Sequence, residues 1–488
     1  MRPAYETPLV IGDRELAPSA AASFERRDPV SGRVVTRATA ASVDDARAAC
    51  HAATAAFPAW SLLAPHARRD LLSAAADELE ARAGEFIEAM AAETGASPQW
   101  AAMNVRLGAA MLREAAALVT QVQGEMIPAD EQGQIGMAMR QPAGVCLGIA
   151  PWNAPVILGV RAIATALACG NTVVVKSAET CPRTHWLIVD TLRRVGFAPG
   201  VVNLVSNAPS DASAVVEALI AHPAVRRVNF TGSTRVGRLV AETCARHLKR
   251  PLLELGGKAP FIVLNDADLE EAARAAAYGA YVNQGQICMS TERIVVDASV
   301  ADRFVQLLAA RVQALKAGLP GAPGCVLGAM VSREAVDRVR AMIEDALRKG
   351  ARLVAGGESD AGGIVMQPAL LDRVTPAMQI YHDESFGPVA CIVRVRSVEE
   401  AITVANDNAY GLAAAVFGRD VSRALQVARL VDSGICHINS ATVQDQPQVP
   451  FGGTKASGHG RFGGRAGIDE FTELRWITVQ TTPRTYDF

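Results

Sequence analysis

The chain has 488 residues, of which 50% are hydrophobic and 20% charged, a balance typical of a globular protein too long for one ordinary core. Lys and Arg total 48 against 50 Asp and Glu, a formal net charge of −2, which argues against nucleic acid or an acidic membrane as partner. The first twenty residues lack an apolar signal segment, and no stretch is apolar enough to span a bilayer. The nine cysteines form no C-x-x-C pair, which argues against a metal site. We therefore expect a cytoplasmic protein that binds small molecules and copies of itself.

Before residue 122 the pattern predicts helices rather than strands. Ser42 and Asp45 form a capping box for one helix, and Leu72, Leu79 and Phe86 share one face of another. Residues 122–140 are polar and extended, and the last segment, 473–481, alternates in the manner of a strand. Exposed strands are commonly paired, so we expect these two segments to form an arm that joins subunits.

Between residues 144 and 255, short apolar runs alternate with segments of helical periodicity. The expected strands are 144–150, 172–175, 201–205, 227–230 and 251–255. Strands connected by helical crossovers predict a parallel, doubly wound sheet, with ligands at the carboxyl ends of its strands.

A second alternating series follows residue 256. Its expected strands are 261–264, 294–296, 389–395, 413–417 and 435–438. No flexible linker separates the two series, so the domains should pack closely. We predict an α/β protein with a first domain of residues 1–121 and 141–255, a second of 256–450, and an arm of 122–140 and 470–488.

One cysteine and one glutamate carry the strongest chemical signal. Cys288 ends a Gly-containing turn, and Glu254 ends a predicted strand 34 positions earlier. A thiolate can hold a carbonyl carbon as a thioester, and a carboxylate can activate the water that releases it. Asn153 ends the first strand of the parallel series, where it is either a helix cap or a hydrogen-bond donor to an oxyanion.

Glycine turns at the strand ends point to a phosphate-bearing ligand. Gly232 and Ser233 precede a predicted helix, whose free backbone N–H groups attract phosphate. Within residues 144–255, neither G-x-G-x-x-G nor a P-loop follows any of the expected strands. Each turn alone is therefore weak evidence.

Six motifs occur in order along the chain: PWN at 151–153, FTGST at 230–234, ELGGK at 254–258, QGQIC at 284–288, ESFGP at 384–388 and PFGG at 450–453. Together they resemble the aldehyde dehydrogenase superfamily over nearly the whole length. The resemblance implies a Rossmann-like, doubly wound NAD-binding domain, a second α/β catalytic domain and a small β oligomerisation arm. It also implies a homodimer or homotetramer.

Carried over to this chain, the resemblance makes Cys288 the nucleophile, Glu254 the general base and Asn153 part of the oxyanion hole. It implies NAD as cofactor, preferred over NADP because Glu179 would repel a 2′-phosphate. The residues it assigns to the cofactor are Ile149, Ala150, Pro151, Trp152, Lys176, Ser177, Glu179, Thr231, Gly232, Ser233, Val236, Leu255, Gly256, Glu384 and Phe386.

Arg161 interrupts an otherwise apolar helix and falls on the same face as Asn153. A buried guanidinium needs a partner, which is either a structural carboxylate or a polar group of the substrate. The resemblance assigns to the substrate channel Arg161, Trp100, Asn104, Ile287, Met289 and Phe451.

The runs at 103–107, 150–161 and 283–293 are most similar to the salicylaldehyde and vanillin dehydrogenase branch, which implies oxidation of an aromatic aldehyde. A semialdehyde or betaine aldehyde dehydrogenase would keep the same catalytic residues and differ in the pocket. A CoA-acylating relative would lack the base at Glu254. A non-catalytic structural relative, such as a lens crystallin, would be expected to lose Cys288, Glu254 or Asn153.

Overall fold

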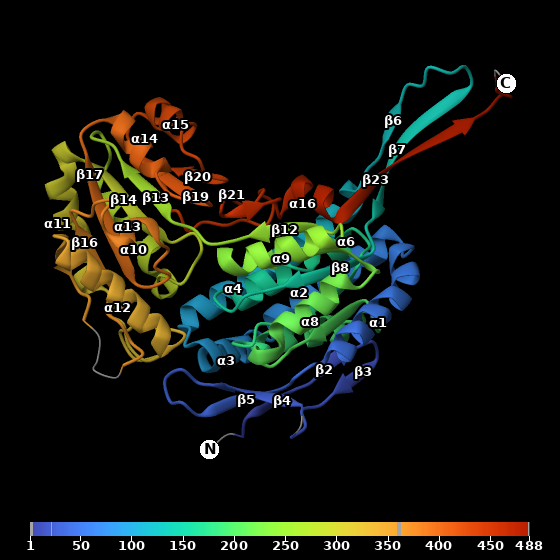
Figure 1. Cartoon of the computed structure of the whole chain (residues 1–488), viewed down its shortest axis with the longest axis horizontal. Coiled ribbons are helices and arrows are strands. Elements are labelled where there is room, and N and C mark those ends of the chain that lie inside the picture. Colours follow the sequence, from blue (N-terminus) through green and yellow to red (C-terminus); the bar gives the residue numbers. More distant parts are fainter. Residues whose placement is uncertain (1–2, 21, 359–362, 487) are drawn as a thin grey trace.

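The computed structural model describes residues 3–20, 22–358, 363–486 and 488. Residues 1–2, 21, 359–362 and 487, which the predicted domain ranges include, lie outside the described residues. Two α/β bodies lie side by side, and a narrow β arm projects from one of them (Figure 1). The α/β fold class predicted from the sequence is confirmed.

The first body is built on an eight-stranded sheet of order β22-β12-β11-β8-β9-β10-β2-β3. Its five strands β12, β11, β8, β9 and β10 are parallel and match the five predicted ones. Parallel strands are buried on both faces and therefore consist of continuous apolar runs, which are recognisable in the sequence. The strands are β2 (Leu9–Ile11), β3 (Arg14–Leu16), β8 (Val145–Ile149), β9 (Thr172–Lys176), β10 (Val202–Val205), β11 (Val225–Thr231), β12 (Arg250–Glu254) and β22 (Gly458–His459).

Helices cover both faces of this sheet. Alternate strand residues belong to two separate apolar clusters, one with α2 to α7 and one with α1, α8 and α9. The predicted capping box is present, since Ser42 Oγ accepts from Asp45 N and Asp45 Oδ2 accepts from Ser42 N. The helices are α1 (Val43–Ser61), α2 (Pro65–Ala81), α3 (Ala83–Thr94), α4 (Pro98–Leu118), α5 (Pro155–Arg161), α6 (Ala164–Ala168), α7 (Pro182–Arg194), α8 (Ala212–Ala221) and α9 (Thr234–Arg246), with short 3-10 turns η1 (Val119–Gln121) and η2 (Pro209–Asp211).

The prediction of helices rather than strands at the start of the chain is wrong for the residues before α1. Strands β2 and β3 extend the first sheet, and β1 (Tyr5–Thr7), β4 (Ser23–Arg27) and β5 (Val34–Thr39) form a separate three-stranded sheet. These strands are three to six residues long. Runs this short carry too little periodicity to be distinguished from loops, and their pairing with distant strands stabilises them.

The second body is built on a seven-stranded sheet of order β15-β16-β17-β14-β13-β19-β20. Its five predicted strands are confirmed, whereas β15 and β16 at the edge were not predicted. The strands are β13 (Ala259–Val263), β14 (Thr291–Asp297), β15 (Arg352–Ala355), β16 (Ala369–Asp372), β17 (Val389–Val395), β19 (Ala413–Phe417) and β20 (Ile435–Ile438).

Helices α10 and α11 pack on one face of the second sheet, and α12 to α15 pack on the other. Their bounds are α10 (Leu269–Tyr281), α11 (Ala298–Ala314), α12 (Arg333–Arg348), α13 (Gln379–His382), α14 (Val398–Asn406) and α15 (Val421–Ala428), with a 3-10 turn, η3 (Val282–Gly285), after α10. A two-stranded ladder joins β18 (Tyr410–Gly411) to β21 (Thr454–Lys455).

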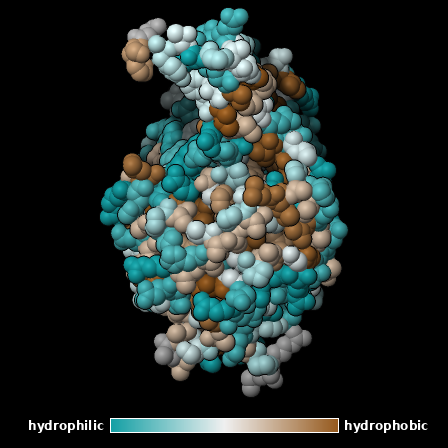
Figure 2. Space-filling view, turned by 90° about the vertical axis from the view of Figure 1, so that its right-hand side faces the viewer, coloured by the Kyte–Doolittle hydropathy of each residue, from teal (hydrophilic) through white to brown (hydrophobic). Residues whose placement is uncertain are grey.

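The arm contains β6 (Glu125–Ile127), β7 (Gln134–Pro142) and β23 (Thr472–Gln480), in the antiparallel order β23-β7-β6. Large apolar side chains on it are exposed, among them Met126, Leu474 and Trp476, the last at 76%. Figure 2 shows hydrophobic residues gathered below the arm on the same side of the molecule.

Before β23, the last strand of the arm, the chain returns from the second body to the first. Strand β22 pairs with β12, and α16 (Gly464–Phe471) adds Ile468 and Phe471 to the core beneath α4 and α6. Among the described residues, no helix is long and apolar enough to cross a membrane. That same part of the chain contains no cluster of His, Cys, Asp or Glu suited to hold a metal ion.

Candidate active site

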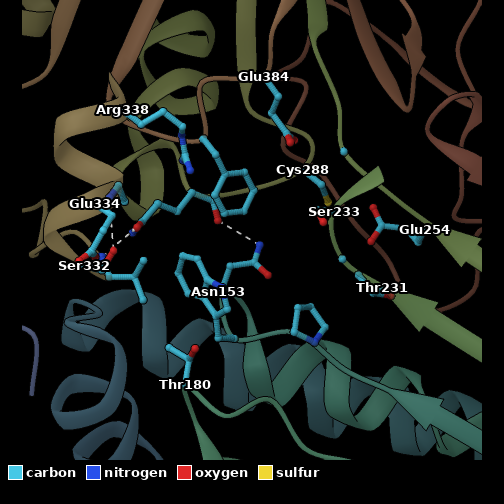
Figure 3. A pocket seen from close by; sticks show the side chains of 18 of the residues that line it. Asn153, Thr180, Thr231, Ser233, Glu254, Cys288, Ser332, Glu334, Arg338 and Glu384 are labelled. Atoms are coloured by element: carbon cyan, nitrogen blue, oxygen red, sulfur yellow. Dashed lines mark hydrogen bonds between the residues drawn. The ribbon is translucent and has the colours of Figure 1, made fainter. Parts of the chain in front are cut away.

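Three side chains predicted to be catalytic converge at the carboxyl edge of the first sheet (Figure 3). Asn153 lies between β8 and α5, and Glu254 is the last residue of β12. Both strands flank β11 in parallel, so their ends lie at the same edge of the sheet. Cys288 reaches this edge from the second body, in the loop between η3 and β14.

The turn before Cys288 has an unusual backbone. Asn283, Gln284 and Gly285 have φ values of 51°, 55° and 67°, in the left-handed region that costs non-glycine residues free energy. Gly285 is required, because a Cβ there would lie 2.1 Å from the Gly387 carbonyl oxygen.

Side-chain bonds hold this turn in place. Asn283 Nδ2 donates to the Asn153 carbonyl oxygen at 3.0 Å, and Gln284 Nε2 donates to the Ala329 carbonyl oxygen at 2.8 Å. Gln286 Oε1 accepts from Val331 N at 3.0 Å. The surrounding structure therefore determines the strained conformation, as is common at functional sites.

The Asn153 side chain is oriented toward the cysteine loop. Its Nδ2 donates one hydrogen bond to the Gln286 carbonyl oxygen at 3.0 Å, two residues before Cys288. An amide nitrogen carries two hydrogens, so a second donor remains for an oxygen bound near the thiol. Asn153 makes no side-chain cap to α5, which argues against the alternative of a helix cap.

Glu254 is fully buried, and neither carboxyl oxygen has a conventional hydrogen-bond partner among the described residues. Burial raises the pKa of Glu254 to about 7, while the nearby Cys288 thiol and Arg161 lower it in part. A carboxyl group that titrates near neutral pH is suited to accept and release protons.

Burial and the Glu254 carboxylate raise the pKa of the Cys288 thiol well above its ordinary value, and the Arg161 guanidinium opposes this effect. The thiol is consequently protonated at neutral pH in this state. It needs a base to become a nucleophile, and Glu254 is the neighbouring base.

A cavity of about 570 Å³ opens on one side of Cys288. Its lining includes eight of the predicted cofactor residues: Pro151, Trp152, Thr231, Gly232, Ser233, Gly256, Glu384 and Phe386. Ser233 caps α9 by accepting from Val236 N, so the helix start faces this cavity. A helix start with free N–H groups suits a pyrophosphate.

Glu384 enters the same cavity from the second body. Its Oε1 accepts from Gly257 N at 2.8 Å, and burial raises the pKa of Glu384 to about 8. A Cβ at Gly256 would lie 2.7 Å from Glu384 Oε2, so a larger residue there would require the Glu384 carboxylate to move.

A buried ion pair supports the loop that carries Glu384. Lys258 Nζ lies 2.6 Å from Glu292 Oε2, and both side chains are almost fully buried. The Glu292 carboxylate also accepts from Ser385 N, Ser385 Oγ and Phe386 N. These charge-assisted bonds fix the turn after Glu384.

Lys176 and Glu179 lie at the end of β9, outside the lining of the 570 Å³ cavity. They form an ion pair, and Glu179 Oε1 also accepts from Asn207 Nδ2 at 2.9 Å. Burial raises the pKa of Glu179, but the Lys176 charge and these bonds outweigh it and leave the pKa lowered. Five further predicted cofactor residues do not line the cavity: Ile149, Ala150, Ser177, Val236 and Leu255.

A second cavity, of about 250 Å³, lies on the other side of the thiol. Its walls are mostly apolar and come from α4, α5, α10 and three loops. Five of the six predicted substrate residues line it: Trp100, Arg161, Ile287, Met289 and Phe451. Asn104 does not, because its amide is turned to the Trp100 carbonyl and Ile157 N–H groups within the wall.

The partner of Arg161 is a structural carboxylate. Arg161 Nη2 pairs with Asp445 Oδ2, and both side chains are less than a tenth exposed. The guanidinium carbon also lies 4.1 Å from the centre of the Phe451 ring, a favourable cation–π distance. Of the two partners that the sequence left open for Arg161, a structural carboxylate or a polar group of the substrate, the structure contains the first.

Several lining residues were not predicted from the sequence. In the larger cavity they include Arg26, Thr180, Ser332, Glu334, Arg338 and Tyr410, and in the smaller one Leu107, Tyr278, Gln444 and Asp445. Thr180 directly follows Glu179, so proximity to that motif was an available signal. Leu107 ends the run 103–107 that resembles the aromatic aldehyde branch, so a signal was available there as well. The others lie in segments that carry no motif of their own.

The fold and this geometry define a two-domain α/β enzyme with a cysteine between two cavities. The profile of the aldehyde dehydrogenase family matches residues 16–477. The chain is 58% identical over 481 residues to a vanillin dehydrogenase of Pseudomonas fluorescens, and 47% identical over 484 residues to a salicylaldehyde dehydrogenase of Pseudomonas putida, with 99% of this chain and at least 99% of each relative covered.

A crystal structure of a salicylaldehyde dehydrogenase from Pseudomonas putida G7 complexed with salicylaldehyde superposes with a TM-score of 0.96 at 47% identity and covers 99% of both chains. The chain therefore belongs to the aldehyde dehydrogenase family and is an enzyme that oxidises an aldehyde.

Proposed function

We propose that the protein oxidises an aromatic aldehyde to its carboxylic acid, with NAD as the hydride acceptor and Cys288 as the nucleophile. The observation that carries this proposal is the position of Cys288, which is common to the lining of both cavities. One cavity has phosphate- and ribose-binding chemistry, and the other has apolar walls. A thiol between them can hold the aldehyde carbon beside a nicotinamide.

The smaller cavity supports an aromatic substrate. Trp100, Ile157 and Phe451 give it flat, apolar surfaces, which suit a ring better than a charged or flexible chain. Two relatives that match this chain over nearly its full length are named as dehydrogenases of vanillin and salicylaldehyde, which are both aromatic aldehydes.

The reaction begins with activation of the thiol. Glu254 accepts the Cys288 proton, and the thiolate adds to the aldehyde carbon, forming a carbon–sulfur bond and moving the carbonyl electrons onto oxygen. The free hydrogen of Asn153 Nδ2 stabilises the resulting oxyanion, because Gln286 already holds the amide in position.

The larger cavity fits NAD on three observations. The start of α9 lies in the cavity wall at Ser233, Glu384 is a partly exposed acceptor for a ribose hydroxyl, and Gly256 has no side chain that would narrow the cavity beside Glu384. When bound, NAD would accept the hydride from the aldehyde carbon, which leaves a thioester on Cys288. Trp152 and Phe386, in edge-to-face contact at 5.8 Å, add an aromatic wall.

Hydrolysis of the thioester completes the cycle. Glu254 first releases the proton it took from Cys288 to solvent. It then takes a proton from water, the hydroxide adds to the acyl carbon, and the carbon–sulfur bond breaks to release the acid and the Cys288 thiolate. The unpaired oxygens of Glu254 are available for this water.

We infer a preference for NAD over NADP from Glu179. Its carboxylate is kept ionised by Lys176 and Asn207, and a negative charge beside the adenosine ribose would repel a 2′-phosphate.

We also infer that the first body binds the cofactor, that the second supplies the nucleophile, and that the arm joins subunits. Exposed Met126, Leu474 and Trp476 make the arm an unfavourable surface in water unless another copy covers it.

The proposal is tested by following NADH formation with vanillin, salicylaldehyde, benzaldehyde, succinate semialdehyde and hexanal. Aromatic aldehydes should give the highest kcat/KM, and Cys288→Ala should abolish turnover. Cys436→Ala, at another partly exposed thiol, is the matched control and should retain it. Preference for the semialdehyde or hexanal would overturn the substrate class, and activity in Cys288→Ala would overturn the mechanism.

A further inference from the structure

The Arg161–Asp445 pair leaves one carboxylate oxygen unused. Asp445 Oδ2 is held by Arg161, whereas Oδ1 is buried and has no hydrogen-bond partner among the described residues. A buried acceptor without a partner costs roughly 1–3 kcal/mol. Asp445 forms part of the wall of the 250 Å³ cavity that also contains Cys288, so a substrate donor could satisfy this oxygen.

Arg161 does not satisfy both oxygens itself. A guanidinium can bind a carboxylate through two parallel bonds, but here only Nη2 pairs with Asp445. The guanidinium is instead stacked 4.1 Å from the Phe451 ring centre. This stacking orients Arg161 and leaves Asp445 Oδ1 without a protein donor.

Asp445 supplies the one carboxylate among the described residues that line this cavity, and two other polar groups of the wall are already hydrogen-bonded. Trp100 Nε1 donates to the Asn153 carbonyl oxygen at 3.0 Å, and Gln444 Oε1 accepts from Ser440 Oγ at 2.8 Å. Asn153 Nδ2 serves the oxyanion in the proposed mechanism. Asp445 is therefore the strongest acceptor left in the cavity wall.

We propose that Asp445 is the specificity residue of this cavity, accepting a hydrogen bond from a ring hydroxyl of a neutral aromatic aldehyde. The inference rests on the proposed function and narrows its substrate class to hydroxylated aryl aldehydes. Arg161 is a positioning residue that holds Asp445 in place, and it is not the group that binds the substrate hydroxyl.

The same pair excludes carboxylated aldehydes. The charge of Arg161 is neutralised by Asp445, so no free cation remains to bind a substrate carboxylate. A second carboxylate would meet the negative charges of Asp445 and Glu254 in a buried setting, where like charges repel strongly.

The test compares kcat/KM for 4-hydroxybenzaldehyde, vanillin and salicylaldehyde with kcat/KM for benzaldehyde in each variant. A hydrogen bond to a charged group is worth about 1.5–3 kcal/mol. The wild type should therefore favour at least one hydroxylated aldehyde over benzaldehyde by about tenfold to a hundredfold.

Three variants separate the roles of the two residues. Arg161→Met/Asp445→Leu replaces the pair by apolar side chains, which a folded protein often tolerates, and it should abolish the preference for the hydroxyl group. Arg161→Met alone should weaken the preference without abolishing it, because Asp445 remains but is no longer held in position. Asp445→Asn should gain turnover of 4-carboxybenzaldehyde, since Arg161 is then an unpaired cation.

Gln446→Ala, at the exposed neighbour of Asp445, is the matched control and should keep the wild-type ratio. Retention of the hydroxyl preference in the double variant, or its loss in Arg161→Met alone, would overturn the role of Asp445. Equal kcat/KM for hydroxylated aldehydes and benzaldehyde in the wild type would also overturn it while leaving aromatic aldehyde oxidation intact. Failure to oxidise any aromatic aldehyde would instead overturn the proposed function.

Discussion

A single methyl group at Gly257 should displace the nucleophile. A Cβ built at this residue lies 2.1 Å from the Cys288 carbonyl oxygen, whereas real Cβ contacts are essentially never shorter than 3.0 Å. In Gly257→Ala the two loops must therefore separate by about 0.9 Å, the difference between these distances. A misplacement of about 1 Å can reduce catalysis about a hundredfold, so we expect kcat to fall by about that factor.

The displaced segment also contains the Gly257 N–H group that binds Glu384, so KM for NAD should rise. Overpacking of this kind destabilises a protein by about 1–3 kcal/mol, which leaves the variant folded. Steady-state kinetics with saturating NAD measures the effect, and circular dichroism confirms the fold.

Gly84→Ala is the matched control. Gly84 lies in the exposed first turn of α3, and a Cβ there meets nothing within 4 Å. This variant should keep full activity and gain up to about 1 kcal/mol of stability. If Gly257→Ala retained kcat within threefold of the wild type, contact between the Gly257 loop and the Cys288 loop could not determine the position of Cys288.

The remaining predictions concern protons, the buried ion pair, the cofactor and assembly. Glu254 must lose its proton to act as a base, and its pKa is about 7, so kcat/KM should rise with pH around a midpoint of about 7. Glu254→Gln should lose this pH dependence. An unchanged pH profile in the variant would refute the role of Glu254 as the base. Lys258→Met leaves Glu292 charged and buried, so it should lower the free energy of unfolding in urea by about 3–5 kcal/mol. Lys349→Met, at an exposed pair, should lower it by about 0–1 kcal/mol. Equal losses would show that burial does not make the Lys258–Glu292 pair more important for stability. Glu179→Gln should raise the NADP to NAD ratio of kcat/KM about tenfold or more, and a constant ratio would exclude Glu179 as the discriminator. Trp476→Glu should lower the mass measured by light scattering, and an unchanged assembly would show that the arm does not join subunits.

The central strands of both sheets were predictable because each is a run of apolar residues buried on both faces. The strands before α1 and strands β15 and β16 were not. Most of these segments are partly exposed, whereas β2 and β16 are buried but only three and four residues long. Their conformation depends on pairing with residues far away in the chain, which periodicity cannot reveal.

The candidate site divides in the same way. Cys288, Glu254 and Asn153 were recognisable because each ends a strand or turn within a motif. The partner of Arg161 was not, because Asp445 lies 284 positions away in a loop without a recognisable pattern. The position of Asn104 was also unpredictable, since only the packing of α4 against α5 shows that its amide faces the wall.

The most direct test of the account is the mass of Glu254→Gln after reaction with benzaldehyde and NAD. In this variant the Glu254 carboxylate no longer raises the pKa of Cys288, so part of the thiol still ionises and reacts slowly, whereas no base remains for hydrolysis. Intact-protein mass spectrometry with peptide mapping should therefore show a benzoyl group on Cys288, formed only when NAD is present. Formation of NADH without an acyl group on Cys288, or acylation of another residue, would contradict the thioester mechanism.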